Sequence, residues 1–270
     1  MTDMNAVVGD HDLLLVTLDT LRYDVAADLA ARGRTPNLVR ALPGGVWQER
    51  HSPASFTYAA HQAFFAGFLP TPVTAGPHSR LFAARFPGSE TTDAGTWVFD
   101  APDLVTGLAA AGYHTACVGG VGFFNRLSPL GSVLPSLFAE SHWAPELGVT
   151  NPDSFTAQLD RMAAVVATAP ADRPLFGFLN VSALHQPNRF YLPGSTVDGV
   201  ESHAAALEYV DRHIDRLFRL ATQRGRPCFT IVCSDHGTAY GEDGHTGHRH
   251  AHPIVWTVPY AEFTLHPGQW

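Results

Sequence analysis

Short apolar segments that alternate with helical segments constrain the fold of this chain more than any other feature. Each apolar segment is continuous, as expected of a strand that is buried on both faces of a sheet. These segments lie at residues 13–18, 113–118, 174–181 and 227–233, with a weaker one at 254–258. The helical patterns lie at residues 58–67, 101–111, 153–169 and 202–221. The alternation predicts an α/β fold with a mostly parallel central sheet and helices on both faces.

The pattern at residues 202–221 is the clearest helix, because its apolar side chains recur at helical spacing on one face. That apolar face consists of Leu207, Val210, Ile214, Leu217 and Phe218. The side chains predicted to face water are those of His203, Asp211, Arg212, His213, Asp215 and Arg216.

The chain has 270 residues, which suits one large domain with a conventional core. No internal repeat, low-complexity block or polar linker divides it, so we expect a flexible N-terminus at 1–10 and a single domain over 11–270. Two stretches, at 70–95 and 120–150, are rich in Gly, Pro and Ser and lack periodicity. Long loops in a compact domain are usually functional or disordered, and we expect these two to line the functional site.

Charge and composition exclude several classes of partner. The 17 Lys and Arg against 25 Asp and Glu give a formal net charge of -8 without long blocks of like charge. We therefore expect neither nucleic acid nor an anionic membrane surface as a partner. No apolar run approaches the roughly 18 to 20 residues of a membrane-spanning helix, and residues 1–12 lack the pattern of a secretory signal. Cys117, Cys228 and Cys233 are too few for a disulfide framework and are predicted to be buried and reduced. A cytoplasmic location is the resulting expectation.

The chain contains 15 histidines, a residue type that often binds metals or transfers protons near neutral pH. One of them, His236, belongs to the sequence Ser234-Asp235-His236-Gly237, which follows the apolar segment 227–233. Asp19 directly follows the segment 13–18. Ligands of doubly wound sheets bind beyond the carboxyl ends of the strands, so we expect these three side chains to converge on a divalent metal. Taken singly, Asp19 also fits a helix cap and Asp235 a turn.

Six short motifs, in the same order along the chain, resemble those of the sulfatase-like branch of the alkaline phosphatase superfamily. The motifs are LVTLDTLRYD at 15–24, TPNL at 35–38, TYAAHQAFFAGFLP at 57–70, GYHT at 112–115, HQP at 185–187, and SDHG at 234–237 followed by GEDGH at 241–245. The motif at 57–70 matches the family's nucleophile helix in spacing, and the last motif matches its metal-binding signature. The resemblance implies that the chain has the alkaline phosphatase-like fold.

The resemblance also implies a reaction in which a hydroxyl group activated by a metal attacks phosphorus or sulfur, and water then cleaves the covalent ester. By this resemblance Asp19, Asp235 and His236 hold the metal, and Thr57 bridges metal and substrate. Two carboxylates, an imidazole and a hydroxyl suit Mn²⁺, Zn²⁺, Mg²⁺ or Ca²⁺. Thr57 also fits the N-cap of the helix that it begins, a role that Ser55 could fill instead.

The chain departs from the family pattern at the positions that contact sulfate. Thr57 stands where sulfatases have a Cys or Ser that is oxidised to formylglycine, which Thr cannot form. The Arg four residues later is His61 here, and we expect His61 to be a catalytic residue that contacts the substrate or a second metal. The Lys after Gly119 is Gly120. These departures favour phosphate or phosphonate esters over sulfate esters.

His185 and His248 have two interpretations. Members of the family with two metal ions carry an Asp four residues before the first of these histidines, where this chain has Val181. In one interpretation His185 and His248 bind a second ion. In the other, which we favour, they contact the phosphate and protonate the leaving oxygen. The loop that contains His245, His250 and His252 also fits a solvated His-rich segment.

The chain is short for this family, and the resemblance implies that it lacks the usual C-terminal subdomain. Either a second protomer of a homo-oligomer completes the pocket, or a partner protein presents a large substrate. The expected substrate is therefore a phosphorylated or phosphonate small molecule or a modified peptide. Two alternatives remain beside the hydrolase: a transferase that moves the phospho group to an acceptor, and a protein that binds metal but has no activity.

Overall fold

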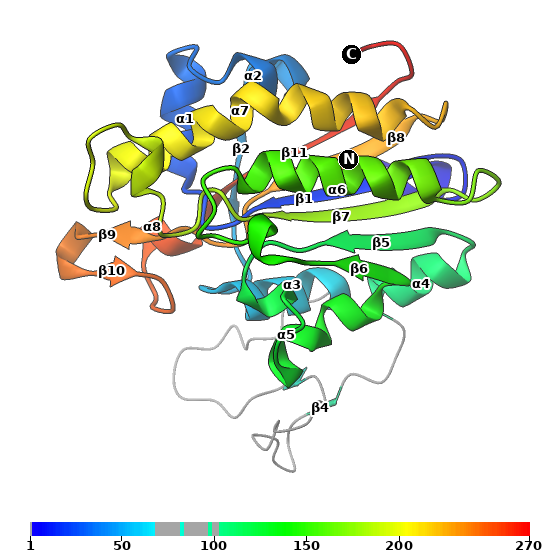
Figure 1. The fold of residues 1–270 in the computed structure, drawn as a ribbon, viewed down its shortest axis with the longest axis horizontal. Helices are drawn as coiled ribbons and strands as arrows, with labels where there is room; N and C mark the ends of the chain where they lie inside the picture. Colours follow the sequence, from blue (N-terminus) through cyan, green and yellow to red (C-terminus); the bar gives the residue numbers. More distant parts are fainter. Residues whose placement is uncertain (1, 68–81, 84–96, 99–102) are drawn as a thin grey trace.

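A seven-stranded sheet forms the centre of the computed structural model, which describes residues 2–67, 82–83, 97–98 and 103–270 (Figure 1). The strand order is β2-β11-β8-β1-β7-β5-β6. The strands are β1 (Asp12–Leu18), β2 (Gln48–His51), β5 (His114–Val118), β6 (Glu140–His142), β7 (Leu175–Val181), β8 (Cys228–Cys233) and β11 (Thr257–Leu265). The strands from β8 to β6 run parallel, and β11 is antiparallel to both β8 and β2. The mostly parallel sheet expected from the sequence is confirmed.

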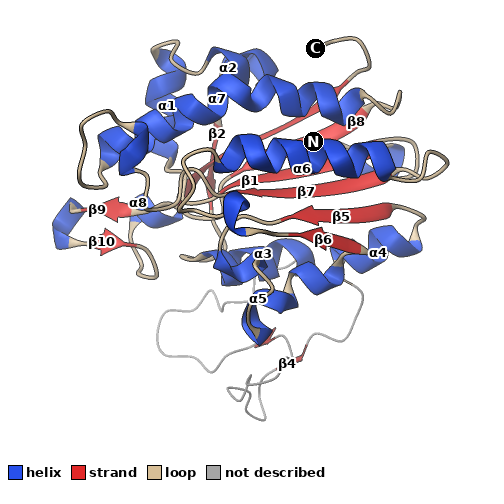
Figure 2. Ribbon diagram, viewed as in Figure 1, coloured by secondary structure: helices blue, strands red, loops and turns tan. Residues whose placement is uncertain are grey.

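Helices cover both faces of the sheet (Figure 2). One layer consists of α1 (Tyr23–Ala31), α2 (Pro36–Ala41), α6 (Ser154–Thr168) and α7 (Val200–Thr222). The opposite layer contains α3 (Thr57–Ala66), α4 (Leu104–Ala110) and α5 (Pro129–Val133). Further short elements are α8 (Pro253–Trp256), the pair β9 (Ala239–Tyr240) and β10 (Thr246–Gly247), the pair β3 (Phe82–Ala83) and β4 (Trp97–Val98), and several single turns of 3-10 helix. Among the described residues, no helix combines the length and apolar character needed to cross a bilayer.

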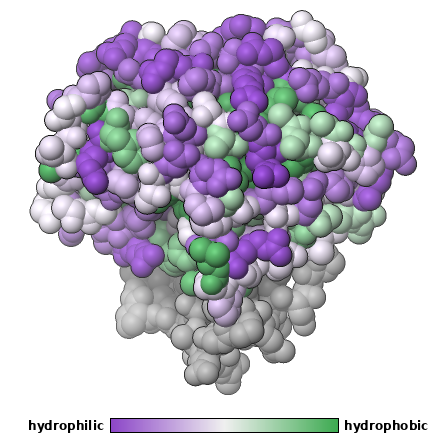
Figure 3. All heavy atoms as spheres, viewed as in Figure 1, coloured by the Kyte–Doolittle hydropathy of each residue, from purple (hydrophilic) through white to green (hydrophobic). Residues whose placement is uncertain are grey.

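Two hydrophobic cores, one on each face of the sheet, explain why the strand segments are continuously apolar. Alternate residues of a strand point to opposite faces. In β1, Leu14, Val16 and Leu18 join the core beneath α6 and α7, whereas Leu13 and Leu15 join the core beneath α3 and α4. Hydrophilic side chains cover much of the face in Figure 3 above the first of these cores, around α2 and α7.

The predicted strands and long helices agree with the structure to within a few residues, but the segment 254–258 does not. Pro253 begins the short helix α8, and the Nδ1 atom of His252 caps it by accepting a hydrogen bond from the Ile254 N–H at 3.2 Å. The last strand starts only at Thr257 and runs to Leu265. The stretch 120–150 contains several short elements, among them the edge strand β6, whose three partly buried residues give no apolar pattern. The stretch 70–95 lies outside the described residues except for 82–83.

Two side chains that were predicted to face water on α7 are buried. Asp211 is 2% exposed because its carboxylate caps α2, accepting a hydrogen bond from the Leu38 N–H at 2.8 Å. His203 is fully buried, with its Nδ1 atom 3.2 Å from the Tyr240 hydroxyl. Both interactions join α7 to segments distant in sequence, so a helical pattern alone could not reveal them. The three cysteines are free and buried, as predicted.

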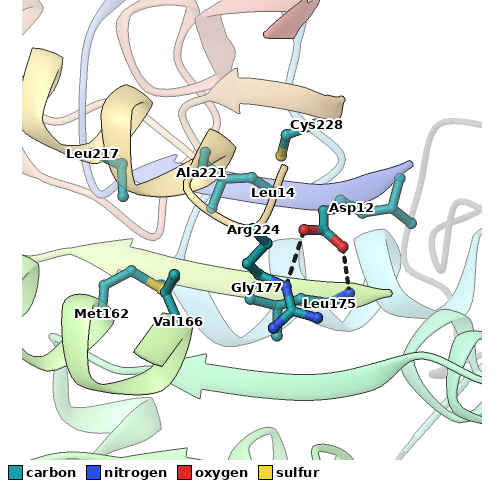
Figure 4. A pocket seen from close by; sticks show the side chains of 11 residues that line it. Asp12, Leu14, Met162, Val166, Leu175, Gly177, Leu217, Ala221, Arg224 and Cys228 are labelled. Atoms are coloured by element: carbon teal, nitrogen blue, oxygen red, sulfur yellow. Dashed lines mark hydrogen bonds and ion pairs between the residues drawn. The ribbon is translucent and has the colours of Figure 1, made fainter. Parts of the chain in front are cut away.

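A buried ion pair fastens the amino-terminal ends of the central strands (Figure 4). The Asp12 carboxylate accepts hydrogen bonds from the Leu175 N–H at 2.7 Å and from the Arg224 Nε–H at 3.2 Å. The Asp12 side chain is 3% exposed and the Arg224 side chain 8%, and both border a cavity of about 20 Å³. The Arg224 guanidinium also donates to the carbonyl groups of Ala169, Pro170 and Arg173. This pair links β1, β7 and the end of α7, at the opposite end of β1 from Asp19.

Replacing Arg224 by Ala should lower the free energy of unfolding by about 3 kcal/mol, because it leaves a buried carboxylate and three carbonyl groups without their donor. Urea unfolding followed by circular dichroism measures the change. Arg161→Ala, at an exposed position of α6, is the control and should change the stability by less than about 0.5 kcal/mol. Equal stability of the two variants would contradict this role of Arg224.

Candidate active site

Asp19, Asp235 and His236 meet where β1 and β8 end. The two strands pair in parallel, with Thr17 opposite Cys233, so the residues that follow them are neighbours. One oxygen of each carboxylate and one ring nitrogen of His236 all lie within 4.8 Å of one another, and none of the three side chains is exposed. The convergence predicted from the sequence is therefore present in the structure.

Each carboxylate of this cluster keeps one buried oxygen without a hydrogen bond. Asp19 Oδ2 accepts a hydrogen bond from the Asn180 amide at 3.0 Å, but Asp19 Oδ1 has no partner. Asp235 Oδ1 accepts from the backbone N–H groups of Thr20 and His236 at 3.2 and 3.1 Å, but Asp235 Oδ2 has no hydrogen bond. Buried polar atoms are rarely left unpaired, and these two oxygens are the kind of donor atom that a cation binds.

The tautomer of His236 follows from its hydrogen bond. Its Nδ1 atom lies 2.8 Å from the Gly237 carbonyl oxygen, which can only accept, so Nδ1 carries the proton. The Nε2 atom therefore has a free lone pair, and it lies 3.5 Å from Asp235 Oδ2. A ring nitrogen held in this way by a backbone carbonyl is typical of metal-binding histidines.

Burial without a counter-charge changes the protonation of this cluster. Burial, together with the neighbouring Asp235 carboxylate, raises the pKa of Asp19 to about 6. Burial raises the pKa of Asp235 to about 7. Burial also lowers the pKa of His236. All three shifts favour uncharged side chains, and a bound cation would reverse the effect on both carboxylates.

Thr57 is the first residue of α3, and its side chain faces the cluster. The hydroxyl oxygen lies 3.2 Å from His236 Nε2 and 3.5 Å from Asp19 Oδ2. The N-cap residue of α3 is Phe56, and no side chain caps the helix. The alternative role of Thr57 or Ser55 as the cap is therefore wrong. The N-terminus of α3 lies beside this hydroxyl, and the dipole of the helix favours an anion there.

His185 and His248 lie beside Thr57, around one cavity of about 280 Å³. The ring of His248 is centred 4.6 Å from that of His236 and 5.8 Å from that of His185. His248 Nδ1 is buried without a partner, and burial lowers the pKa of His248 to about 3. The rest of the lining comes from Val121, Gly122, Phe123, Ser128, Leu130, Gly131, Val149 and Arg249. The stretch 120–150 thus lines the site, as expected.

His61 lies beneath the site rather than in the cavity. It is fully buried, its Nδ1 donates to the Thr57 carbonyl at 2.7 Å, and its Nε2 lies 3.0 Å from the Thr17 hydroxyl. Burial lowers its pKa to about 3, so the ring is neutral. The ring packs among Phe64, Phe65, Phe124 and Phe178. This geometry favours a role in positioning Thr57 over direct contact with a substrate.

The other departure from the family pattern, Gly120, has a steric reason. A Cβ atom at this position would lie 2.4 Å from the Asn180 carbonyl oxygen and 2.8 Å from Ser182 Cβ. The backbone after β5 therefore packs directly against the end of β7, and no side chain fits at Gly120 without moving it.

Several residues that hold the site in place were missed by the sequence analysis. Thr20 has a φ of 67°, which is rare and strained for a β-branched residue, and its N–H and hydroxyl bind Asp235 and the Leu184 carbonyl. The buried Arg22 forms ion pairs with Asp24 and Glu242. Asn180 donates a hydrogen bond to Asp19. The sequence carries a signal for this residue, because it is a polar amide near the carboxyl end of the apolar segment 174–181.

The histidines of the loop after β9 form a separate group. The rings of His245 and His250 stack with their centres 4.8 Å apart. His252 Nε2 lies 3.0 Å from Asp243, while its Nδ1 caps α8. Within the described part of the chain, the metal-ligand geometry found for Asp19, Asp235 and His236 is not found for these histidines.

Solved structures with this fold include three domains of phospho-group transferases and synthases. The soluble domain of lipooligosaccharide phosphoethanolamine transferase A from Neisseria meningitidis has a TM-score of 0.64 and 16% identity, with 95% of this chain and 77% of that chain covered. The C-terminal periplasmic domain of EptC from Escherichia coli, in complex with Zn, has a TM-score of 0.60 and 14% identity, covering 95% and 73%. The lipoteichoic acid synthase LtaP from Listeria monocytogenes has a TM-score of 0.58 and 13% identity, covering 98% and 67%. At these identities the likeness establishes a common fold.

These neighbours correct one expectation. The cytoplasmic location expected from the sequence is contradicted, because the matched domains of EptC from Escherichia coli and Campylobacter jejuni are periplasmic.

Sequence comparison identifies the family directly. No curated protein sequence matches the chain. The model of the sulfatase family, however, matches residues 11–260, which contain all the motifs described above. The chain therefore belongs to the sulfatase family.

Proposed function

We propose that this protein is a metal-dependent enzyme that cleaves phosphate or phosphonate esters through a covalent bond to Thr57. The observation that carries the proposal is the position of the Thr57 hydroxyl. It lies between the buried cluster of Asp19, Asp235 and His236 and the cavity that His185 and His248 line.

The donor atoms fit a divalent cation. Asp19, Asp235 and His236 would hold it, with the Thr57 hydroxyl beside it, and the two unpaired carboxylate oxygens would gain the partner that they lack. Oxygen and imidazole ligands in this number suit Zn²⁺, Mn²⁺, Mg²⁺ or Ca²⁺, and the EptC fold neighbour contains Zn. A bound cation supplies Lewis-acid chemistry, which lowers the pKa of a hydroxyl and offsets charge on a phosphoryl group.

The residues of the chain account for the first half of the reaction. Thr57 Oγ1 forms a bond to phosphorus as the ester P–O bond breaks and its electron pair leaves with the departing oxygen. Thr57 passes its proton to solvent water, and the departing oxygen takes up a proton from solvent water. His248 is neutral at neutral pH in the free protein, because burial lowers its pKa to about 3. Its one ring N–H can donate a hydrogen bond to a phosphoryl or leaving oxygen. The Nδ1–H of His185 donates to the Gln186 carbonyl oxygen at 2.6 Å, so His185 can donate to the substrate only when its Nε2 atom is protonated as well.

The second half of the reaction has two candidate acceptors. Water as the acceptor gives a hydrolase, which is the function that we propose first. A hydroxyl or amine of a second substrate gives a transferase, and the fold neighbours that are phosphoethanolamine transferases or a lipoteichoic acid synthase support this candidate. Formylglycine chemistry is not proposed, because Thr57 cannot be oxidised to an aldehyde.

Replacing Thr57 by Val should lower kcat by at least about 10³-fold, because the nucleophile is removed while the shape of the side chain is kept. Release of 4-nitrophenol from 4-nitrophenyl phosphate, bis(4-nitrophenyl) phosphate and 4-nitrophenyl phenylphosphonate measures turnover. Thr57→Ser keeps a hydroxyl and is the matched control, for which measurable activity is expected. Unchanged activity of Thr57→Val on these esters would contradict the mechanism, and inactivity of the wild type on all of them would favour a protein without activity.

The metal-free protein should become less stable as the pH rises from about 5 to 8. With pKa values raised to about 6 and about 7, Asp19 and Asp235 hold protons in the folded protein that the unfolded chain has lost. The free energy of unfolding therefore falls through this window. Asp19→Asn should reduce this dependence and should be more stable than the wild type at pH 8, by on the order of 2 kcal/mol.

Added Mn²⁺ should stabilise the wild type most at the upper end of this window and should hardly affect Asp19→Asn. Urea unfolding at both pH values, in EDTA and in Mn²⁺, measures these effects. Identical pH dependence of the wild type and Asp19→Asn, or an equal response of both to Mn²⁺, would show that the cluster does not bind metal.

Product analysis separates the two acceptors. With 4-nitrophenyl phosphate as donor and glycerol and ethanolamine as added acceptors, a hydrolase releases all of the phosphate as inorganic phosphate. Phosphorus NMR of the products measures the partition. Phosphorylated glycerol or ethanolamine as the main product would contradict the hydrolase and support the transferase.

A further inference from the structure

Arg249 places a positive charge at the cavity beside Thr57. Its side chain lines the same cavity as Thr57, His185 and His248, and none of the residues that line this cavity is acidic. Arg249 therefore brings a positive charge to this lining, and no acidic side chain of the lining offsets it.

The guanidinium of Arg249 has no carboxylate partner within the described ranges. The ion pairs of those ranges use other arginines, as in the pairs of Arg22, Arg189, Arg216 and Arg224. The guanidinium instead lies 5.6 Å from the centre of the Phe56 ring, directly before α3. Arg offers five N–H donors in a planar fork that suits phosphate oxygens, and here this fork is left for a ligand.

The backbone of Arg249 is held in a strained conformation. Its φ of 77° lies in the left-handed region, which Gly adopts readily and other residues rarely. The Arg249 N–H donates to the Ser55 carbonyl at 2.9 Å, two residues before Thr57. The strained residue is thus fastened to the segment that presents the hydroxyl. A Gly would relieve the strain but would remove the positive charge from the cavity.

Most of the other residues that line the cavity are apolar. Val121, Phe123, Leu130 and Val149 provide most of it, with Ser128 as a polar member. A volume of about 280 Å³ is at the small end for a ligand pocket. One cationic side chain in a mostly apolar lining suits a small ester with an anionic head and an apolar organic group.

We propose that Arg249 is a specificity-determining residue that binds an anionic oxygen of the substrate beside Thr57, while the apolar lining takes the organic group. The substrate class is then a small phosphate or phosphonate ester with an aryl or short alkyl group. The inference rests on the function proposed above, because it takes this cavity as the place where the ester binds.

Binding of phenylphosphonate to the metal-loaded protein, measured by isothermal titration calorimetry, tests this role without turnover. Arg249→Gln should raise Kd by about 10-fold, because one charge-assisted contact is lost. Arg249→Lys should restore part of the affinity. Arg161→Gln removes the same charge from an exposed position of α6 and should leave Kd unchanged. Added salt should narrow the difference between the wild type and Arg249→Gln.

Arg249→Gly separates ligand binding from a purely structural role. It should weaken phenylphosphonate binding as much as Arg249→Gln does, while its thermal unfolding midpoint stays equal to or above that of the wild type, because the left-handed strain is relieved. A lower midpoint with unchanged Kd would show that Arg249 is structural and would overturn the proposal. An equal Kd for the wild type and Arg249→Gln, or no binding to the wild type, would overturn it as well.

These outcomes are distinct from a failure of the proposed function. If Thr57→Val loses activity and Arg249→Gln has an unchanged Kd, Thr57 is supported as the nucleophile and only the proposed role of Arg249 is wrong. If Thr57→Val keeps full activity and Arg249→Gln has a raised Kd, the covalent mechanism is wrong and Arg249 is supported as an anion-binding residue.

Discussion

Two carboxylates that are buried side by side without a counter-charge determine how this site must be understood. Asp19 and Asp235 lie just after the ends of two adjacent parallel strands, β1 and β8. Each carboxylate has one oxygen without a hydrogen bond. A protein normally avoids such an arrangement, because burial of a charge is costly and two like charges add to that cost. The rest of the site is arranged around this pair: His236 presents a lone pair to it, and Thr57 presents a hydroxyl.

The surrounding structure supports this costly arrangement. Thr20 takes a strained conformation so that its N–H reaches Asp235, and Asn180 donates to Asp19 from the neighbouring strand β7. The ion pair between Arg22 and Glu242 links the segment after β1 to the loop that carries Glu242. Beneath the cluster, His61 joins the first turn of α3 to β1 through its two ring nitrogens. Sites whose groups are held by packing and by hydrogen bonds in this way are preorganised for binding and chemistry.

The sequence predicted the sheet and the convergence of Asp19, Asp235 and His236 because both depend on local patterns. Apolar runs mark strands that are buried on two faces, and a polar residue directly after such a run lies at the edge where ligands bind. The role of His61 could not be predicted, because spacing along α3 does not reveal that Phe64, Phe65, Phe124 and Phe178 enclose its ring. The burial of His203 and Asp211 was missed for the same reason, since their partners are distant in sequence. Arg249 was missed because only the fold brings it to Thr57.

The central claim is that a divalent cation occupies the cluster at the ends of β1 and β8. Anomalous X-ray diffraction from crystals of the protein grown with Mn²⁺ or Zn²⁺ tests it most directly, because the signal locates the ion whatever the reaction is. The account predicts a peak within bonding distance of Asp19, Asp235 and His236, next to the Thr57 hydroxyl. A peak only at the loop of His245, His250 and His252, with none between the two carboxylates, would contradict it.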